Sequence, residues 1–189
     1  LWTAALVSFA LAAHPFVTYP LSLMALRKSA VPRATPSAES PTFTICMCAY
    51  NEERVIEQKA QNLPALKARE PSLQILIYVD AASDRTAEIL QAYAHYFEIH
   101  VASERRGKTH GMNLLAARAT GSVLVFTDAN VMLDESCIDN LRRDFADREI
   151  GCVCGNLIYT NGTDSVTAST GSLYWKLEER IKLREQRTG

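Results

Sequence analysis

The stretch Ser122-Val-Leu-Val-Phe-Thr-Asp-Ala-Asn130 decides the fold, because an uncharged apolar run ends in two oxygen-bearing side chains separated by one residue. The run from Val123 to Phe126 is rich in branched and aromatic residues, which is typical of a strand buried on both faces of a parallel sheet. Ligands of such sheets bind beyond the carboxyl ends of the strands. We therefore expect Asp128 and Asn130 to lie at the mouth of a site, although a helix cap or an Asx turn uses the same residue types.

Outward from this strand, apolar runs alternate with helical patterns. The runs predict strands over 42–49, 73–79 and 98–102, and a further apolar segment follows at 150–159. Helices are predicted over 52–69, from the capping residue Asp84 onward, over 108–119 and over 135–148. This alternation predicts an α/β fold, with a mostly parallel sheet covered by helices on both faces.

The composition sets bounds on the function. The chain has 189 residues, of which 48% are hydrophobic and 22% charged, so it can bury the core of one ordinary domain. A net charge of −1 gives no reason to expect nucleic acid as a partner. Cys46, Cys48, Cys152 and Cys154 lie in apolar runs typical of strands. We therefore expect buried, reduced thiols and a reducing compartment.

The first 26 residues form a separate unit, because they contain no Asp, Glu, Lys or Arg. Their length is enough to cross a hydrocarbon core of about 30 Å, which predicts a transmembrane helix. Basic residues follow at once, and such residues tend to remain in the cytoplasm. We expect a linker at 27–41, rich in Pro, Ser and Ala, and a cytoplasmic domain at 42–189. A cleaved signal peptide is the alternative, but it would have a shorter apolar core after a basic stretch.

Three other strand ends carry polar residues that converge on the same edge of the predicted sheet. Tyr50 offers a ring for stacking and Asn51 an amide for reading a base edge. Asp80 can accept hydrogen bonds from a ring N–H or from ribose hydroxyls. The loop 104–113, Glu-Arg-Arg-Gly-Lys-Thr-His-Gly-Met-Asn, is cationic and suits a diphosphate. At Asp128 and Asn130, carboxylate and amide oxygens suit Mg²⁺ or Mn²⁺, or a sugar hydroxyl.

Some of these residues also have plain structural interpretations. Asp84 is expected to cap a helix, and Arg105 and Arg106 to be solvated surface. The triplet Gly107-Lys108-Thr109 resembles the end of an ATP-binding P-loop, but Ala102 stands where that motif requires its earlier glycine.

Taken in order, the motifs resemble the donor half of a family-two glycosyltransferase with the GT-A fold. They are Cys-Ala-Tyr-Asn-Glu-Glu at 48–53, Val-Asp-Ala-Ala-Ser-Asp-Arg-Thr at 79–86, Arg-Gly-Lys-Thr-His-Gly-Met-Asn at 106–113 and Phe-Thr-Asp-Ala-Asn at 126–130. The first 26 residues, with Tyr19-Pro20, and the stretch 173–180 resemble the membrane-attached members, which include cellulose, hyaluronan and poly-N-acetylglucosamine synthases.

The resemblance implies transfer of a sugar, with inversion, from a nucleotide-diphosphate sugar to a glycan or lipid-linked acceptor. A UDP-linked hexose or N-acetylhexosamine is the expected donor, and Mg²⁺ or Mn²⁺ the expected cofactor. By the same resemblance, Asp128 and Asn130 would bind the metal. The donor-binding residues would be Tyr50, Asn51, Glu53, Asp80, Lys108, Asn113 and Asp128.

The family's general base is expected beyond Gly189, so we expect this chain to supply the donor and metal half and to be inactive alone. Ala81 stands where the family often has a second aspartate, and Asn130 where it has an acidic metal ligand. Because a neutral amide attracts a cation less strongly, we expect metal affinity to be lower or to depend more on the diphosphate. The alternatives are a non-catalytic, membrane-tethered nucleotide-binding or regulatory module, and a nucleotidyltransferase. The latter would need a Gly-rich loop that 48–53 lacks.

Overall fold

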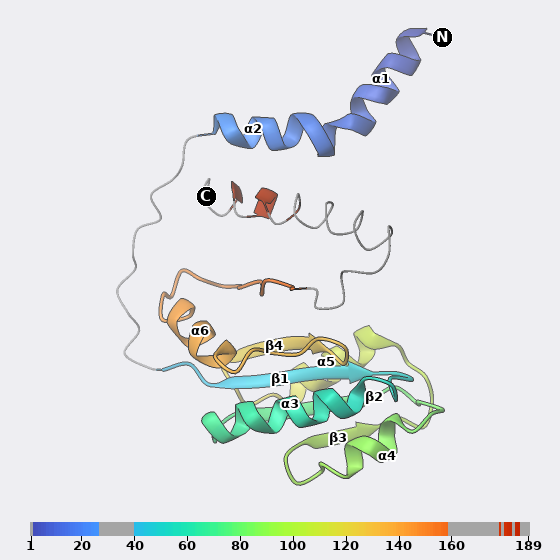
Figure 1. Ribbon diagram of the computed structural model, residues 1–189, viewed down its shortest axis with the longest axis vertical. Coiled ribbons are helices and arrows are strands. Elements are labelled where there is room, and N and C mark those ends of the chain that lie inside the picture. The colour runs from blue at the N-terminus through green and yellow to red at the C-terminus, as the bar shows by residue number, and fades with distance from the viewer. Residues whose placement is uncertain (1, 27–39, 159–177, 179, 183, 186–189) are drawn as a thin grey trace. The chain divides into compact units, whose positions relative to one another are not determined.

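A computed structural model describes residues 2–26, 40–158, 178, 180–182 and 184–185 (Figure 1). The chain divides into two compact units, one made of residues 1–33 and 154–189 and the other of residues 34–153. Most of the predicted linker at 27–41 and of the motif at 173–180 lies outside the described residues. The second unit contains all of the predicted donor-binding and metal-binding residues.

The second unit is built on a parallel sheet in the order β3-β2-β1-β4. Its strands are β1 (Phe43–Ala49), β2 (Gln74–Val79), β3 (Glu98–Val101) and β4 (Val123–Asp128). In the register, Cys48 of β1 is opposite both Tyr78 of β2 and Asp128 of β4. The carboxyl ends of these three strands therefore meet at one edge of the sheet, as predicted.

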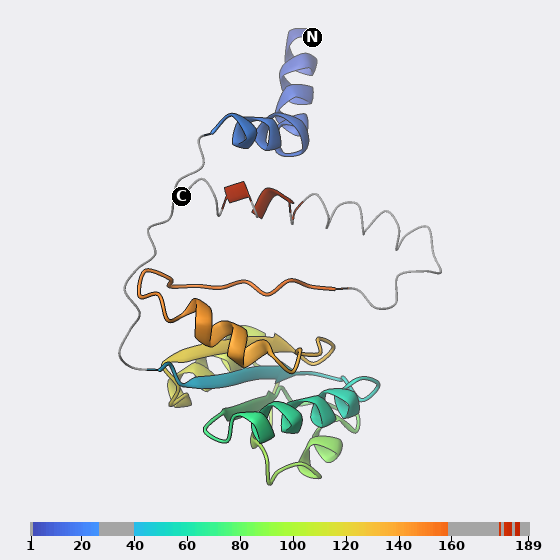
Figure 2. The same cartoon turned by 60° about the vertical axis from the view of Figure 1, so that its left-hand side comes forward.

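Helices cover both faces of the sheet, which confirms the predicted α/β class (Figures 1 and 2). They are α3 (Ile56–Arg69), α4 (Thr86–Gln91), α5 (Lys108–Arg118) and α6 (Cys137–Asp144). On one face, apolar residues of α3, α4 and α6 pack with Ile45 and Ile77 of the sheet. On the other face, Leu115 of α5 packs with Cys46 and Leu76. The alternation of side chains along each strand thus supplies two separate apolar layers.

Helix α5 approaches the sheet closely at Gly111. A Cβ atom there would lie 2.4 Å from Tyr78 Cδ1 and 2.7 Å from Cys48 Sγ. Such distances are clashes, so the absence of a side chain is what lets the first turns of α5 sit on β1 and β2. This contact fixes the start of α5, at Lys108, beside the carboxyl edge of the sheet.

Three helices are clearly shorter than predicted, and one of them is α6, which spans Cys137–Asp144 rather than 135–148. Helix α3 begins at Ile56 rather than at residue 52, because Asn51 adopts a left-handed conformation with φ 54° and residues 53–55 form a turn. Helix α4 ends at Gln91, and turns follow at 92–96 where the sequence pattern indicated a longer helix. All three differences lie at element ends, which local sequence specifies least well.

The prediction that Cys152 and Cys154 are buried in a strand is wrong. Residues 150–158 form no regular secondary structure, and both cysteines are exposed. The apolar composition of this segment favours a strand, but a strand forms only where a neighbour completes its hydrogen-bond ladder. Cys46, by contrast, is buried in β1 as predicted, and Cys48 is partly buried.

The first unit begins with a continuous helical stretch. It consists of α1 (Trp2–Ala13), a π-helical turn (His14–Thr18) and α2 (Tyr19–Ala25), and Pro15 and Pro20 lie within it. The 24 residues from Trp2 to Ala25 are long and apolar enough to cross a membrane. A signal sequence near an N-terminus meets the same criteria, so the transmembrane assignment stays a prediction.

Candidate functional site

The carboxyl edge of the sheet brings Asp128 and Lys108 into contact. Asp128 is the last residue of β4 and Lys108 the first of α5, and Lys108 Nζ donates a hydrogen bond to Asp128 Oδ1. The side chain of Asp128 is 50% exposed and that of Lys108 is 58% exposed. An ion pair this exposed contributes only about 0–1 kcal/mol, so both groups can take new partners at little cost. Asn130, two residues beyond Asp128, is exposed as well.

Asp80 holds the loop that leads to Lys108. Its side chain is buried, and its two carboxylate oxygens accept hydrogen bonds from the backbone N–H groups of Arg106 (2.8 Å) and Gly107 (2.9 Å). Gly107 has a φ of 87°, a conformation that L-residues with side chains rarely adopt. Asp80 therefore acts on the site at least through the backbone geometry of the residues just before Lys108.

Asn51 joins the end of β1 to the loop after β2. Its Oδ1 accepts a hydrogen bond from the backbone N–H of Ser83 (2.8 Å), and its Nδ2 donates to Ser83 Oγ (3.2 Å). The left-handed backbone at Asn51 is tolerated because asparagine adopts this conformation more readily than most residues. The amide predicted to read a base edge is thus also a link between two loops of the site.

Glu53 lies in a second link between the same loops. Its backbone N–H donates to Asp84 Oδ2 (3.0 Å), and its Oε2 accepts from the backbone N–H of Arg85 (3.2 Å). Asp84 also accepts from the backbone N–H of Thr86 at the start of α4, in line with its predicted role at a helix start. Burial alone would raise the pKa of Asp84, but the hydrogen bonds from Thr86 and Glu53 lower it overall.

Tyr50 has a partner that the sequence did not suggest. The guanidinium carbon of Arg105 lies 3.9 Å from the centroid of the Tyr50 ring, in a cation–π contact. Arg105 is exposed, as expected for a surface residue, but it covers the ring predicted to stack on a base. Asn113, by comparison, is exposed in the second turn of α5.

Lys59 of α3 is the main residue near the site that sequence reasoning missed. Its side chain is fully buried, and its Nζ donates to Thr127 Oγ1 (3.1 Å) and to the carbonyl oxygen of Val131. Burial lowers the pKa of this lysine to about 8. Lysine at a helical position normally indicates a solvated face, so the sequence carries no local signal for this contact.

This lowered pKa predicts a specific dependence of stability on pH. Between pH 8 and 10.5 the unfolded chain keeps the Lys59 proton while the folded chain has released it, so the free energy of unfolding rises with pH. Between pH 7 and 10.5 the free energy of unfolding of the parent protein should therefore rise by about 3 kcal/mol relative to that of Lys59→Met. Denaturant unfolding of both full-length proteins at each pH measures this difference.

The comparison with the variant is needed because buried thiols change stability in the opposite direction as pH rises. Burial raises the pKa of Cys46 and of Cys48 to about 11, so their contribution to stability falls as pH rises above 9. Both proteins contain these thiols, and the effect of Cys46 and Cys48 cancels in the difference. Burial also raises the pKa of the Cys137 thiol, and the charge of Lys59 lowers it, so the effect of Cys137 cancels only in part. A stability difference between parent and variant that is constant from pH 7 to 10.5 would contradict the prediction.

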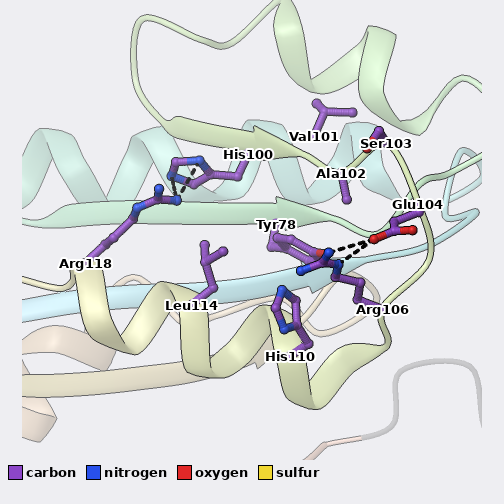
Figure 3. Close-up of a pocket in the computed structure, with 10 residues that line it drawn as sticks. All are labelled: Tyr78, His100, Val101, Ala102, Ser103, Glu104, Arg106, His110, Leu114 and Arg118. Atoms are coloured by element: carbon purple, nitrogen blue, oxygen red, sulfur yellow. Dashed lines mark hydrogen bonds and ion pairs between the residues drawn. The ribbon is translucent and has the colours of Figure 1, made fainter.

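A pocket of about 290 Å³ lies beside the candidate site, between β3 and α5 (Figure 3). Four basic or imidazole side chains line it, Arg106, Arg118, His100 and His110, together with Glu104. Arg106 pairs with Glu104 and Arg118 with His100, so much of this polarity is satisfied within the pocket. Tyr50, Asn51, Asp80, Lys108 and Asp128 are not among its lining residues.

The oxygen ligands at the end of β4 suit a divalent cation whose remaining ligands come from a second molecule. Among the described residues, no group of three or more His, Cys, Asp or Glu side chains is arranged to hold a metal. Asp128 and Asn130 provide one carboxylate and one amide. The ion pair with Lys108 shows that the Asp128 carboxylate is accessible to a positively charged partner. Mg²⁺ commonly binds through one or two carboxylates plus phosphate oxygens and water, which is what this edge permits.

The fold of the second unit belongs to the GT-A class of glycosyltransferases. A solved structure of the mannosyltransferase PcManGT from Pyrobaculum calidifontis, in complex with GDP-Man and Mn²⁺, superposes with a TM-score of 0.57. The match covers 76% of this chain and 42% of that protein, at 24% sequence identity.

The chain belongs to glycosyl transferase family 2, whose profile matches residues 44–188. Among the relatives is the poly-β-1,6-N-acetyl-D-glucosamine synthase of Staphylococcus aureus (strain COL), 29% identical over 120 residues. The synthase of the same name from Staphylococcus epidermidis is 26% identical over 117 residues. Each match covers 60% of this chain and 28% of the relative, so the chain spans well under half the length of these synthases. The predicted membership of a glycosyltransferase family is confirmed.

Proposed function

We propose that this chain binds the donor for a glycosyltransferase that moves a sugar, with inversion, from a UDP-linked hexose or N-acetylhexosamine to a glycan or lipid-linked acceptor. The contact between Lys108 and Asp128 carries the proposal, because it sets a group that suits a diphosphate beside one that suits a cation. The names of the staphylococcal relatives support N-acetylglucosamine as the sugar. The Mn²⁺ in the PcManGT complex supports a divalent cation.

The chain's own residues would act mainly by binding and orientation. Asp128 and Asn130 would hold Mg²⁺ or Mn²⁺, which when bound supplies positive charge that stabilises the leaving diphosphate. Lys108 would place its ammonium on the same diphosphate, where negative charge grows as the glycosidic bond breaks. Asp80 would fix the loop that presents Lys108, since both of its oxygens bind that loop.

The nucleoside would lie toward the ends of β1 and β2. Tyr50 would stack on the base, and Asn51, Glu53 and Asp80 lie on the loops that would border it. Asn113 would complete the donor side from α5. The predicted transmembrane helix at 1–26 and linker at 27–41 would hold this domain at the cytoplasmic face of a membrane, close to a lipid or glycan acceptor.

Binding and transfer by the full-length protein test this proposal. We expect UDP-N-acetylglucosamine to bind more tightly in Mn²⁺ or Mg²⁺ than in EDTA, as measured by calorimetry, and to release UDP when acceptor is present. UDP-glucose and GDP-mannose, tested in the same way, distinguish the sugar and the base. Metal-dependent binding with no release of UDP for any acceptor would indicate a nucleotide-binding module and would overturn the proposed transfer.

A further inference from the structure

We infer that Lys59 and Asn62, both on α3, are positioning residues that set the geometry of the Asp128–Asn130 segment. The inference rests on the proposed function, since it assigns to α3 the placement of the groups that would hold the cation. Neither residue points to donor binding from its sequence context, and neither belongs to the motifs that resemble the glycosyltransferase family.

The two acceptors of Lys59 bracket the segment in question. Thr127 immediately precedes Asp128, and Val131 immediately follows Asn130. Lys59 Nζ donates to the hydroxyl of the first and to the backbone carbonyl of the second, while Ala129 between them is buried. A single buried ammonium therefore joins both ends of the three-residue turn that carries Asp128 and Asn130.

Asn62 makes two further contacts with the same region, one turn further along α3. Its Oδ1 accepts from the backbone N–H of Leu133 (2.9 Å), and its Nδ2 donates to the carbonyl oxygen of Leu133 (2.9 Å). Residues three apart on a helix lie on one face, so Lys59 and Asn62 together bind residues at both ends of the segment 127–133. Both contacts are between residues about 70 positions apart in the chain.

The chemistry of Lys59 indicates a role beyond stability. Its acceptors are a hydroxyl and a carbonyl, neither of which carries a formal charge to offset the buried ammonium. Burying a charge on these terms is unfavourable, and an apolar side chain of similar length would pack in the same place without that cost. What the ammonium provides, and a methyl group cannot, is a fixed distance between Thr127 and Val131.

Loss of these contacts would lower the affinity of the site for the cation. The carboxylate of Asp128 is exposed and lies at a strand end, so its direction depends on the backbone that follows it. Partners that orient metal ligands without touching the metal commonly change metal affinity by about 10- to 100-fold when they are removed. Lys59 fits that description for Asp128 and Asn130.

The test measures the affinity of the full-length protein for UDP by calorimetry, in Mn²⁺ and in EDTA. For Lys59→Met and for Thr127→Val, which removes the hydroxyl acceptor at nearly constant volume, we expect UDP binding in Mn²⁺ to weaken by about 10-fold or more. Binding in EDTA should stay within about twofold of the parent, because the metal-independent contacts are not altered.

Two matched variants separate positioning from general destabilisation. Lys67 is a second lysine of α3 whose Nζ donates to a backbone carbonyl, that of Leu73 (2.6 Å), at the opposite end of the helix. Lys67→Met should lower stability without changing the affinity for UDP in Mn²⁺. Thr127→Ser keeps the hydroxyl and should keep the parent affinity.

The outcomes distinguish this inference from the proposed function. If the parent protein binds UDP equally well in Mn²⁺ and in EDTA, the proposed metal-assisted function fails. If the parent shows metal-dependent binding and both Lys59→Met and Thr127→Val match it, the positioning role is overturned while the proposed function stands. Circular dichroism checks folding, and if Lys59→Met does not fold, the Thr127→Val and Thr127→Ser pair decides.

Discussion

Replacing Asp128 with alanine in the full-length enzyme should reduce kcat for sugar transfer by about 100- to 1,000-fold. Asp128 is the one carboxylate at the end of β4, and Asn130 beside it offers only a neutral oxygen. Without Asp128, the edge would lose its negative charge for a cation, and the leaving diphosphate would lose the charge that the cation supplies. Initial rates of UDP release at saturating donor and Mn²⁺ measure the effect.

The fold should survive this substitution. The Asp128 side chain is half exposed, and its ion pair with Lys108 is of the kind that contributes about 0–1 kcal/mol. Expression and membrane insertion should therefore match the parent. Asp144→Ala, at an exposed position of α6, removes a carboxylate from the same unit and should leave the rate unchanged. Turnover close to the parent value in Asp128→Ala would refute the assignment.

Replacing Lys108 with alanine should weaken the binding of UDP by about 10- to 100-fold and leave the binding of uridine within about twofold. The reason is the position of the ammonium. Lys108 begins α5, where the helix N-terminus and the cationic loop favour anions, and its Nζ already lies on the carboxylate that would hold the cation. Calorimetric titrations of the full-length protein with both ligands give the two ratios.

Lys108→Arg is the matched control for this prediction. It keeps the positive charge at the start of α5, so it should bind UDP closer to the parent than to Lys108→Ala. Equal losses of UDP and uridine affinity in Lys108→Ala would show that Lys108 supports the whole nucleotide site rather than the diphosphate.

Most of the fold could be predicted because its signals are local. The apolar runs at 43–49, 74–79 and 123–128 are strands close to the predicted bounds, and their order with intervening helices specifies a parallel sheet. The prediction that 123–126 is buried on both faces is wrong, because β4 is an edge strand and Phe126 is 53% exposed. The failure at 150–158 has a physical cause. A strand depends on a neighbour as well as on composition, and the sequence of one segment does not contain its neighbour.

The candidate site could likewise be predicted only in part. Residues at strand ends, such as Asn51, Asp80 and Asp128, could be placed on one edge because parallel strands end together. The contacts that orient them could not be predicted. Lys59 reaches Thr127 across 68 positions of sequence, and the contact of Arg105 with Tyr50 joins loops from different strands. Such partners depend on how the helices and loops pack, which no local motif encodes.

If the site binds as proposed, the ion pair between Lys108 and Asp128 would favour binding of a cation and a diphosphate together over binding of either alone. A divalent cation arriving alone meets a carboxylate that is already neutralised and an ammonium that repels it. A nucleoside diphosphate arriving alone draws Lys108 away and leaves Asp128 facing like charge. A cation and a diphosphate arriving together exchange one ion pair for two. Each component would thus bind more weakly alone than the two bind together.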